Sequence, residues 1–137
     1  MDDALQALER GMSTEIWGMR FYEEAVARTA PEDGKRVFQS LVEEEEKHLD
    51  ILRGQYAAVS GEKEWVSIEK ATALPTAVEP SVLFPKASAA EQLIPEDAND
   101  EQALKMAMDF ERRGYELYDR EAKTAASAKA KAMWEYL

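Results

Sequence analysis

Apolar residues in the first sixty positions recur at alternating steps of three and four, which is the period of a helix packed in a bundle. This pattern predicts one helix over residues 2–29 and a second over residues 31–60. The break around Pro31 is short, so the two helices should form an antiparallel hairpin. Glu15 is the one charged member of the inward row of the first helix, which comprises Leu5, Leu8, Met12, Glu15, Met19, Tyr22 and Val26.

The second helix holds the only histidine of the chain, His48, three residues after Glu45. Positions three apart share one face of a helix, and a Glu-x-x-His pair pointing inward is a ligand unit of di-iron carboxylate bundles. The other glutamates of the run at 43–46 should mostly face solvent. The inward row of this helix comprises Phe38, Leu41, Glu45, His48, Leu52, Gln55 or Tyr56, and Val59, and Gly61 is a plausible stop.

Helical periodicity fails over residues 61–98, which contain every proline except Pro31. A segment of this length can return along a whole helix of a bundle, so we expect a crossover connection here. A short helix is expected at Ala87–Leu93. The residues expected to pack on the bundle are Trp65, Val66, Leu83 and Phe84.

A third helix should run from about residue 99 to residue 125, and a fourth should begin near Ser127 and still be running at Leu137. The predicted fold class is therefore all-α: an antiparallel four-helix bundle, with a long crossover between helices 2 and 3 and an incomplete fourth helix. We expect residues 1–137 to form a single domain. The inward row of the third helix should comprise Leu104, Met108, Glu111, Tyr115, Tyr118 and Ala122.

An internal repeat supports this arrangement, because residues 6–41 align without gaps on residues 102–137. The repeat indicates a bundle built from a doubled hairpin. In the same register, the counterparts of Glu45 and His48 would lie four and seven residues beyond Leu137. The identical pairs include Glu15 with Glu111, Gly18 with Gly114, and Tyr22 with Tyr118.

The charge balance narrows the range of partners. Asp and Glu total 28 against 17 Lys and Arg, a net charge of −11, which argues against nucleic acid and against anionic membrane surfaces. The sequence has no cysteine, so it offers no disulfide framework and no thiolate-held iron. It begins with an acidic stretch rather than a signal peptide and has no apolar run long enough for a membrane span. We expect a cytoplasmic protein.

Three glutamates in the inward rows are the candidate functional residues. Glu15, Glu45 and Glu111 lie in rows that otherwise bury apolar groups, and no Lys or Arg shares those rows near the helix centres. A buried carboxylate without a partner is costly, so it takes up a proton or finds a cation. Oxygen and nitrogen ligands suit iron or manganese, with zinc also able to bind. The alternative is a metal-free bundle with protonated or water-linked acids.

Tyr22 follows Glu15 by seven residues, and Tyr118 follows Glu111 by the same number. Seven residues are two helical turns, so each tyrosine lies on the same face as its glutamate. We interpret them as phenols that hydrogen-bond to a ligand carboxylate and orient it. The alternative is an ordinary core tyrosine whose hydroxyl is satisfied elsewhere. The glycines of the repeat, Gly18 and Gly114, are interpreted as positions of close helix packing, and secondly as room for a small oxidant.

The pattern Glu15-x6-Tyr22, Glu45-x-x-His48, a proline-rich crossover and Glu111-x6-Tyr118 resembles the rubrerythrin-like branch of the ferritin-like superfamily. The resemblance implies a non-haem di-iron centre that reacts with hydrogen peroxide or oxygen, as in defence against oxidative stress. The iron ligands it implies are Glu15, Glu45, His48 and Glu111.

The sequence departs from that family pattern in three ways. A second Glu-x-x-His is missing, which leaves open a truncated chain or a site completed by dimerisation. No cysteine is present for a rubredoxin-type electron-transfer domain, so electrons would come from a separate donor. Gly114 stands where full rubrerythrins carry an additional glutamate. The last two departures put efficient peroxidase turnover in doubt.

The favoured function is peroxide reduction or oxidation of ferrous iron at a di-iron centre, with Tyr22 and Tyr118 beside the ligands. One alternative is a non-catalytic iron-binding or iron-sensing helical module. Another is a structural helical dimer whose inward acidic residues hold no metal. We expect a homodimer, in which hairpins could be exchanged. The reason is that an incomplete bundle leaves apolar residues of its inward rows exposed, and these favour contact with a partner.

Overall fold

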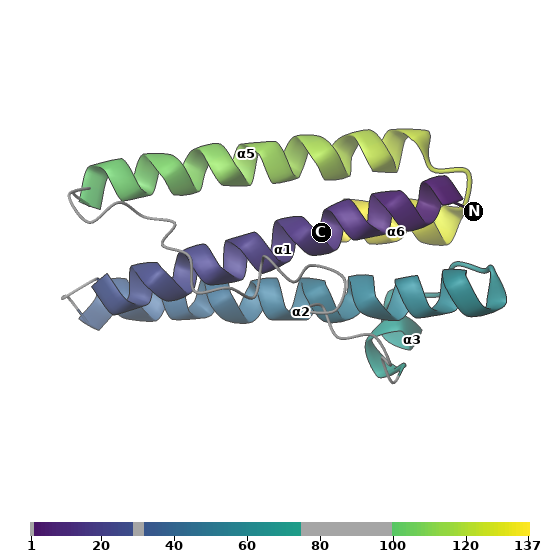
Figure 1. The fold of residues 1–137 in the computed structure, drawn as a ribbon, viewed down its shortest axis with the longest axis horizontal. Helices are drawn as coiled ribbons and strands as arrows, with labels where there is room; N and C mark the ends of the chain where they lie inside the picture. Colours follow the sequence, from purple (N-terminus) through teal and green to yellow (C-terminus); the bar gives the residue numbers. More distant parts are fainter. Residues whose placement is uncertain (1, 29–31, 75–99) are drawn as a thin grey trace.

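The computed structural model describes residues 2–28, 32–74 and 100–137, and the regular structure in these ranges is entirely helical. Its elements are α1 (Asp2–Arg28), α2 (Glu32–Glu62), α3 (Ile68–Ala73), α5 (Asp100–Thr124) and α6 (Ala128–Tyr136). Figure 1 shows α1, α2 and α5 as long helices lying along one direction, and the short α6 contacts α5 and α3. The all-helical fold class is therefore confirmed.

The first two helices form the hairpin expected from the sequence, running in opposite directions and packed along their length (Figure 1). The prediction that α2 stops at Gly61 is wrong, because the helix continues through Gly61 to Glu62. Lys63 follows with a φ of 59°, the left-handed conformation in which helices commonly end. The helix-ending left-handed conformation is therefore adopted by Lys63 and not by Gly61.

Inward rows of the first two helices were predicted well. Leu8, Met12 and Tyr22 of α1 are buried, as are Leu52 and Val59 of α2. At the position left open between Gln55 and Tyr56, the fully buried residue is Gln55. The main apolar cluster joins these helices to α3 and α6, through residues that include Leu8, Met12, Leu52, Ala71, Met133 and Trp134.

A short helix that the sequence pattern did not predict, α3, packs on the end of α2. Gln55 fixes the segment leading into it: its Nε2 donates to the Val66 carbonyl at 2.5 Å and its Oε1 accepts from the Val66 N–H at 3.0 Å. Val66 is buried and Trp65 is partly buried against the core, as expected for both. A buried side-chain amide that pairs both backbone groups of one residue spares that residue the cost of an unpaired N–H and carbonyl.

The predicted inward row of the third helix is wrong over most of its length. Leu104, Met108 and Tyr115 of α5 are 52%, 71% and 69% exposed, and Glu111 is also exposed. The side of α5 that packs on α1 instead carries Ala107, Phe110 and Gly114, all buried. The physical reason is coverage, because no helix in the described ranges packs over the Leu104 side of α5.

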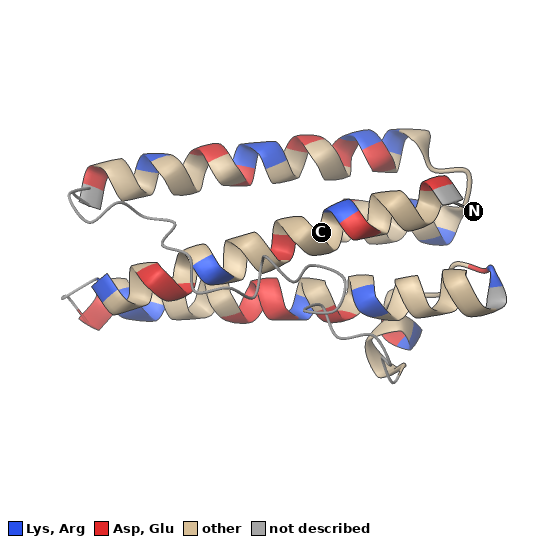
Figure 2. Cartoon of the chain, in the orientation of Figure 1, with Lys and Arg blue, Asp and Glu red and all other residues tan. Residues whose placement is uncertain are grey.

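Charged residues are distributed as the sequence pattern predicts for solvated faces. Figure 2 shows acidic and basic residues interspersed along α5, and acidic residues gathered in the middle of α2. In that acidic run Glu43, Glu44 and Glu46 are exposed, whereas Glu45 is buried. None of the helices in the described part of the chain combines the length and apolar character that a membrane crossing requires.

Several expectations fall outside the described residues. These are the packing of Leu83 and Phe84, the short helix at Ala87–Leu93, and most of the crossover predicted over residues 61–98. The assignment of residues 1–137 to one domain stays a prediction.

Substitution of Gly54 by alanine should loosen α3 from α2. A Cβ built at Gly54 would lie 1.9 Å from the Ala71 carbonyl oxygen, so backbone must move, and overpacking of this kind costs about 1–3 kcal/mol. Gly61→Ala is the matched control on the same helix, because a Cβ there meets nothing within 4 Å. The control should be neutral or gain up to about 1 kcal/mol, as expected when alanine replaces glycine in a helix. Urea unfolding measures both, and equal stabilities would contradict the close approach.

Candidate metal centre

Three ligand-type side chains converge between the first two helices. Glu15 projects from α1, and Glu45 and His48 project from α2, with one potential ligand atom from each lying within 4.8 Å of the others. Glu15 and Glu45 are 2% and 7% exposed, and His48 is partly buried. The three-residue spacing of Glu45 and His48 places both on the face of α2 that meets α1.

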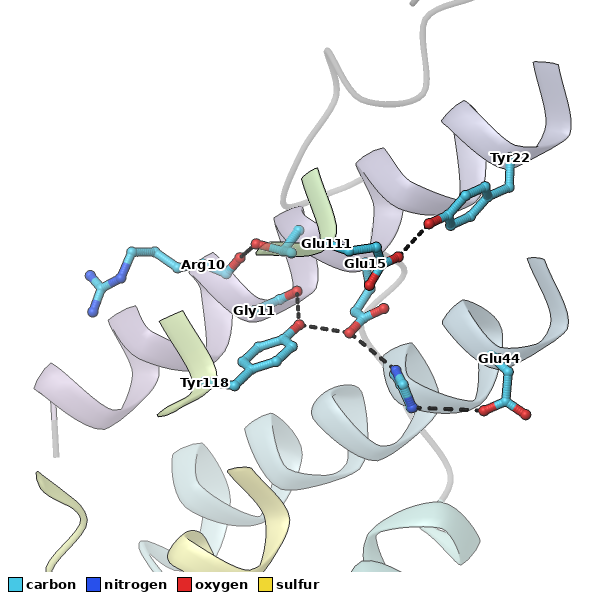
Figure 3. Close-up of polar contacts among 9 residues, drawn as sticks. Arg10, Gly11, Glu15, Tyr22, Glu44, Glu111 and Tyr118 are labelled. Atoms are coloured by element: carbon cyan, nitrogen blue, oxygen red, sulfur yellow. Dashed lines mark hydrogen bonds and ion pairs between the residues drawn. The ribbon is translucent and has the colours of Figure 1, made fainter. Parts of the chain in front are cut away.

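Glu15 has two carboxylate oxygens in different situations (Figure 3). Its Oε1 accepts a hydrogen bond from the Tyr118 hydroxyl at 2.6 Å and lies 3.4 Å from Nδ1 of His48. Its Oε2 is buried and has no hydrogen-bond partner among the described residues. A buried acceptor without a protein partner is rare in native structures, and a bound ion or water is a common reason for one.

His48 lies between two acids. Its Nδ1 faces Glu15, and its Nε2 lies 3.9 Å from Oε2 of the exposed Glu44. Burial acts to lower the pKa of His48, but the contact with Glu15 and the charges of Glu15, Glu44 and Glu111 outweigh burial, so the pKa is raised above its ordinary value. The nitrogen that faces the cluster is thus Nδ1, and Nε2 is left for the outer carboxylate.

The two tyrosines exchange partners between the halves of the repeat. Tyr118 of α5 donates to Glu15 of α1, and Tyr22 of α1 donates to Glu111 of α5. Burial, together with the adjacent carboxylate, raises the pKa of both phenols, so they remain protonated donors. Each carboxylate is therefore held by a phenol from the other hairpin. The hydrogen bonds are those expected from the spacing; that they orient metal-binding groups stays a prediction.

Glu111 is the predicted ligand that the structure does not bring into the cluster. It is exposed and lies outside the group formed by Glu15, Glu45 and His48. It nevertheless lines the same pocket, a space of about 410 Å³ that also borders those three residues. The pocket lies between α5 and α2, whose backbones do not approach each other closely, and Glu111 borders it from α5.

Sequence reasoning missed three residues around this site. Glu44 was assigned to a solvated face, yet it is four residues before His48 and reaches its Nε2. Phe110 and Trp134 border the pocket and were given no place in it. Two signals were available: the four-residue spacing of Glu44 from His48, and the alignment of Trp134 with Phe38 in the repeat.

Gly18 allows a close approach at the centre of the site. A Cβ at this position would lie 2.9 Å from Phe110 Cε1 and 3.1 Å from the carboxyl carbon of Glu45. The predicted role in close packing is confirmed here. Its repeat counterpart is less constrained, because a Cβ at Gly114 would meet only Thr14 Cγ2, at 3.6 Å.

The donor set fits a metal ion. Carboxylate oxygens and one imidazole nitrogen suit iron or manganese, and zinc can occupy such a site. The unpartnered Oε2 of Glu15 is available to a cation, and a cation would compensate the burial of Glu15 and Glu45. The ion itself and the number of ions are not fixed by these residues.

The helical fold and the buried carboxylate–histidine cluster define a helical protein with a candidate metal centre. The chain belongs to the rubrerythrin family, because the family model described as Rubrerythrin matches residues 6–137. This is a family of iron-binding proteins in the ferritin-like superfamily, so the resemblance inferred from the sequence is confirmed. Comparisons with curated proteins and with solved structures gave no match.

Substitution of Gly18 by alanine should weaken metal binding, because the added methyl group displaces either the Phe110 ring or the Glu45 carboxylate. Disturbing the groups that support a ligand typically costs 10–100-fold in metal affinity, and we expect an effect of roughly that size. Calorimetric titration with Zn²⁺, and with Fe²⁺ under anaerobic conditions, measures it. Gly114→Ala is the control with ordinary contacts, and an equal loss in both variants would contradict the role assigned to Gly18.

Proposed function

We propose that this chain is a non-haem di-iron protein that reacts with hydrogen peroxide or oxygen, either reducing peroxide or oxidising ferrous iron. The observation that carries the proposal is the buried Oε2 of Glu15, which lacks a partner inside a carboxylate–histidine cluster. Membership of the rubrerythrin family supports the choice of iron. The corresponding biological role is defence against peroxide in the cytoplasm, with electrons from a separate donor.

Each residue of the cluster has a distinct role in this proposal. Glu15 and Glu45 supply carboxylate oxygens, His48 supplies Nδ1, and Glu111 supplies a further carboxylate from α5. Bound iron would supply one-electron redox chemistry between its ferrous and ferric states. Tyr118 occupies Oε1 of Glu15 with its hydroxyl and leaves Oε2 directed to the metal. Glu44, whose Oε2 lies 3.9 Å from Nε2 of His48, would orient the ring by accepting its Nε2–H on a small approach.

The pocket provides access for a small oxidant. Its space of about 410 Å³ is bordered by the exposed Glu111 and Tyr115 as well as by the buried acids. Hydrogen peroxide and oxygen are small enough to enter such a space from solvent. Protonated phenols of Tyr22 and Tyr118 line the two carboxylates without adding negative charge.

We further propose that the complete fold is a ferritin-like antiparallel four-helix bundle with a long crossover before α5. In this arrangement a fourth helix begun by α6 would cover the pocket, and in the register of the repeat the counterparts of Glu45 and His48 would lie on it. A second copy of the chain is the proposed alternative source of that cover. The support is the exposed α5 stripe, formed by Leu104, Met108 and Tyr115, of which Tyr115 also borders the pocket.

Removal of the Glu45 charge should abolish iron-dependent oxidation. Glu45→Gln keeps the size of the side chain but removes a buried anionic ligand, so protein loaded anaerobically with ferrous iron should lose its rapid oxidation by peroxide or oxygen. Stopped-flow absorbance of ferric iron measures this. Glu46→Gln is the matched control, because Glu46 neighbours Glu45 on α2 but is exposed.

The same experiment separates the proposal from its main alternative. Tight iron binding without accelerated oxidation in the unmodified chain, and in a version extended through a whole fourth helix, would overturn the redox function. That outcome would select a non-catalytic module for iron binding or sensing. Absence of iron binding would leave a structural helical protein.

We also expect the chain to form a homodimer through the α5 stripe, because exposed apolar rows of this kind mark interaction surfaces. Light scattering should then give twice the chain mass of 15.5 kDa. Met108→Lys places a charge on a side chain that is 71% exposed, so it should shift the protein to monomer without unfolding it. Glu116→Gln changes the net charge by the same amount at an exposed position outside the stripe and should leave the dimer intact. A monomer in the unmodified chain would contradict the proposal.

A further inference from the structure

Aromatic side chains form a continuous line that starts at the cluster. Tyr118, whose hydroxyl donates to Glu15, stacks on Trp134 with ring centroids 5.6 Å apart and an angle of 28° between the planes. Trp134 in turn meets Trp65 edge-on, with centroids 6.5 Å apart and an angle of 66°. Each of these three side chains can be oxidised by one electron at potentials that proteins reach.

The line leads from the interior to the surface. Tyr118 and Trp134 are buried, whereas Trp65 is only partly buried. Trp65 and Trp134 both border a second cavity, of about 540 Å³, which also contacts Asp3 and Glu121. A small molecule in this cavity would touch the outer end of the line without touching Glu45 or Glu111, which border the first pocket, and Trp134 borders both spaces.

The internal repeat supplies a comparison within the same molecule. Tyr22 donates to Glu111 as Tyr118 donates to Glu15, and Tyr22 stacks on Phe38 at 6.2 Å and 27°. Phe38 is the repeat counterpart of Trp134, so the two stacks have nearly the same angle. The other aromatic ring against Tyr22 is Phe21. Phenylalanine is not oxidised at potentials that remove an electron from tryptophan or tyrosine.

The two halves thus share the packing and differ in redox chemistry. Packing alone calls for an aromatic ring beside each tyrosine, and a phenylalanine satisfies it at Tyr22. Among the described residues, the Tyr118 side continues directly through two indoles to a surface cavity, whereas the Tyr22 side reaches the indole of Trp17 only across Phe21. This asymmetry is what an electron path would show and what a purely structural aromatic core would not require.

We propose that Tyr118, Trp134 and Trp65 form a one-electron relay that carries electrons from a small one-electron reductant at the Trp65 cavity to the cluster at Glu15. The proposal rests on the function proposed above. Reduction of one hydrogen peroxide to two waters consumes two electrons, delivered singly along the relay, and two protons, which come from solvent. The external reductant loses one electron for each passage.

Each passage restores the three side chains. Tyr118 gives an electron to the oxidised cluster while its phenolic proton moves to Oε1 of Glu15, its hydrogen-bond acceptor. The Tyr118 phenoxyl then takes an electron from Trp134 and recovers its proton, and this uphill step is driven forward because Trp65 reduces Trp134 at once. The reductant finally returns an electron to Trp65. The relay therefore has no net consumption of protein groups.

Pulse radiolysis of the metal-free protein tests the relay without any iron chemistry. Azide radicals remove one electron from tryptophan and become azide anions. Trp17 is first replaced by phenylalanine, which keeps a ring against Phe21 and Phe110, so that the only indoles left are those of Trp65 and Trp134. We expect the indolyl radical absorption to convert to phenoxyl absorption in a first-order phase independent of protein concentration.

Three further substitutions in this background decide the outcome. Trp134→Phe and Tyr118→Phe should each lose the conversion, and the indolyl signal should persist. Tyr22→Phe is the matched control, because Tyr22 has the same type of carboxylate bond but phenylalanine neighbours, and it should leave the conversion unchanged. Circular dichroism checks that each variant is folded, and Tyr118→Phe, which retains the ring, stands if Trp134→Phe does not fold.

The result separates this proposal from the preceding one. Conversion that survives both Trp134→Phe and Tyr118→Phe overturns the relay, because another tyrosine then accepts the oxidation. Lost conversion in these variants with no iron oxidation in the unmodified protein overturns the di-iron function and leaves the electron path standing. In iron-loaded protein, electron paramagnetic resonance after peroxide addition should show a tyrosyl signal that Tyr118→Phe removes and Tyr22→Phe retains.

Discussion

A carboxylate buried in the middle of a helical hairpin is the constraint on which this site depends. Glu15 is 2% exposed, and transfer of an ionised carboxylate from water into such an interior is costly unless charge and hydrogen bonds compensate it. Tyr118 and His48 both approach one of its oxygens and leave the other without a partner. Burial of Glu45 at the same place adds a second negative charge. The buried charge therefore calls for a proton or a cation, and the imidazole of His48 adds a nitrogen that can serve as a metal ligand.

The doubled hairpin explains how the site is held together. Because each half contributes one glutamate and one tyrosine, the hydrogen bonds cross from α1 to α5 in both directions. These bonds tie α5 across the pocket although α5 does not contact α2. The halves have diverged where they meet other elements: Trp134 stands against Tyr118 where Phe38 stands against Tyr22. A symmetric scaffold thus surrounds two chemically different tyrosines.

The sequence predicted the hairpin and three of the site residues because large apolar side chains mark the buried faces of α1 and α2. It failed on α5 because two candidate rows lie one residue apart there. Leu104, Met108 and Tyr115 form the more apolar row, but Ala107, Phe110 and Gly114 form the one that packs. Small residues such as Ala107 and Gly114 let two helices approach closely. A pattern of hydrophobic residues does not reveal this property, because small residues are only weakly hydrophobic. The short α3 depends on the contact of Gln55 with Val66, and no local pattern announces such a long-range pairing.

Comparison of Glu15 with Glu111 shows that coverage, and not the phenol, decides whether a carboxylate needs a cation. Both accept a tyrosine hydroxyl, yet Glu15 is buried and Glu111 is exposed. The difference is the neighbouring helix: α2 covers Glu15, whereas no described element covers the Glu111 side of α5. A helix placed over the α5 stripe would withdraw Glu111 from water and add its desolvation cost to that of Glu15 and Glu45. Any element that covered the α5 stripe would therefore also increase the need for metal charge, because it would make a third carboxylate costly without a cation.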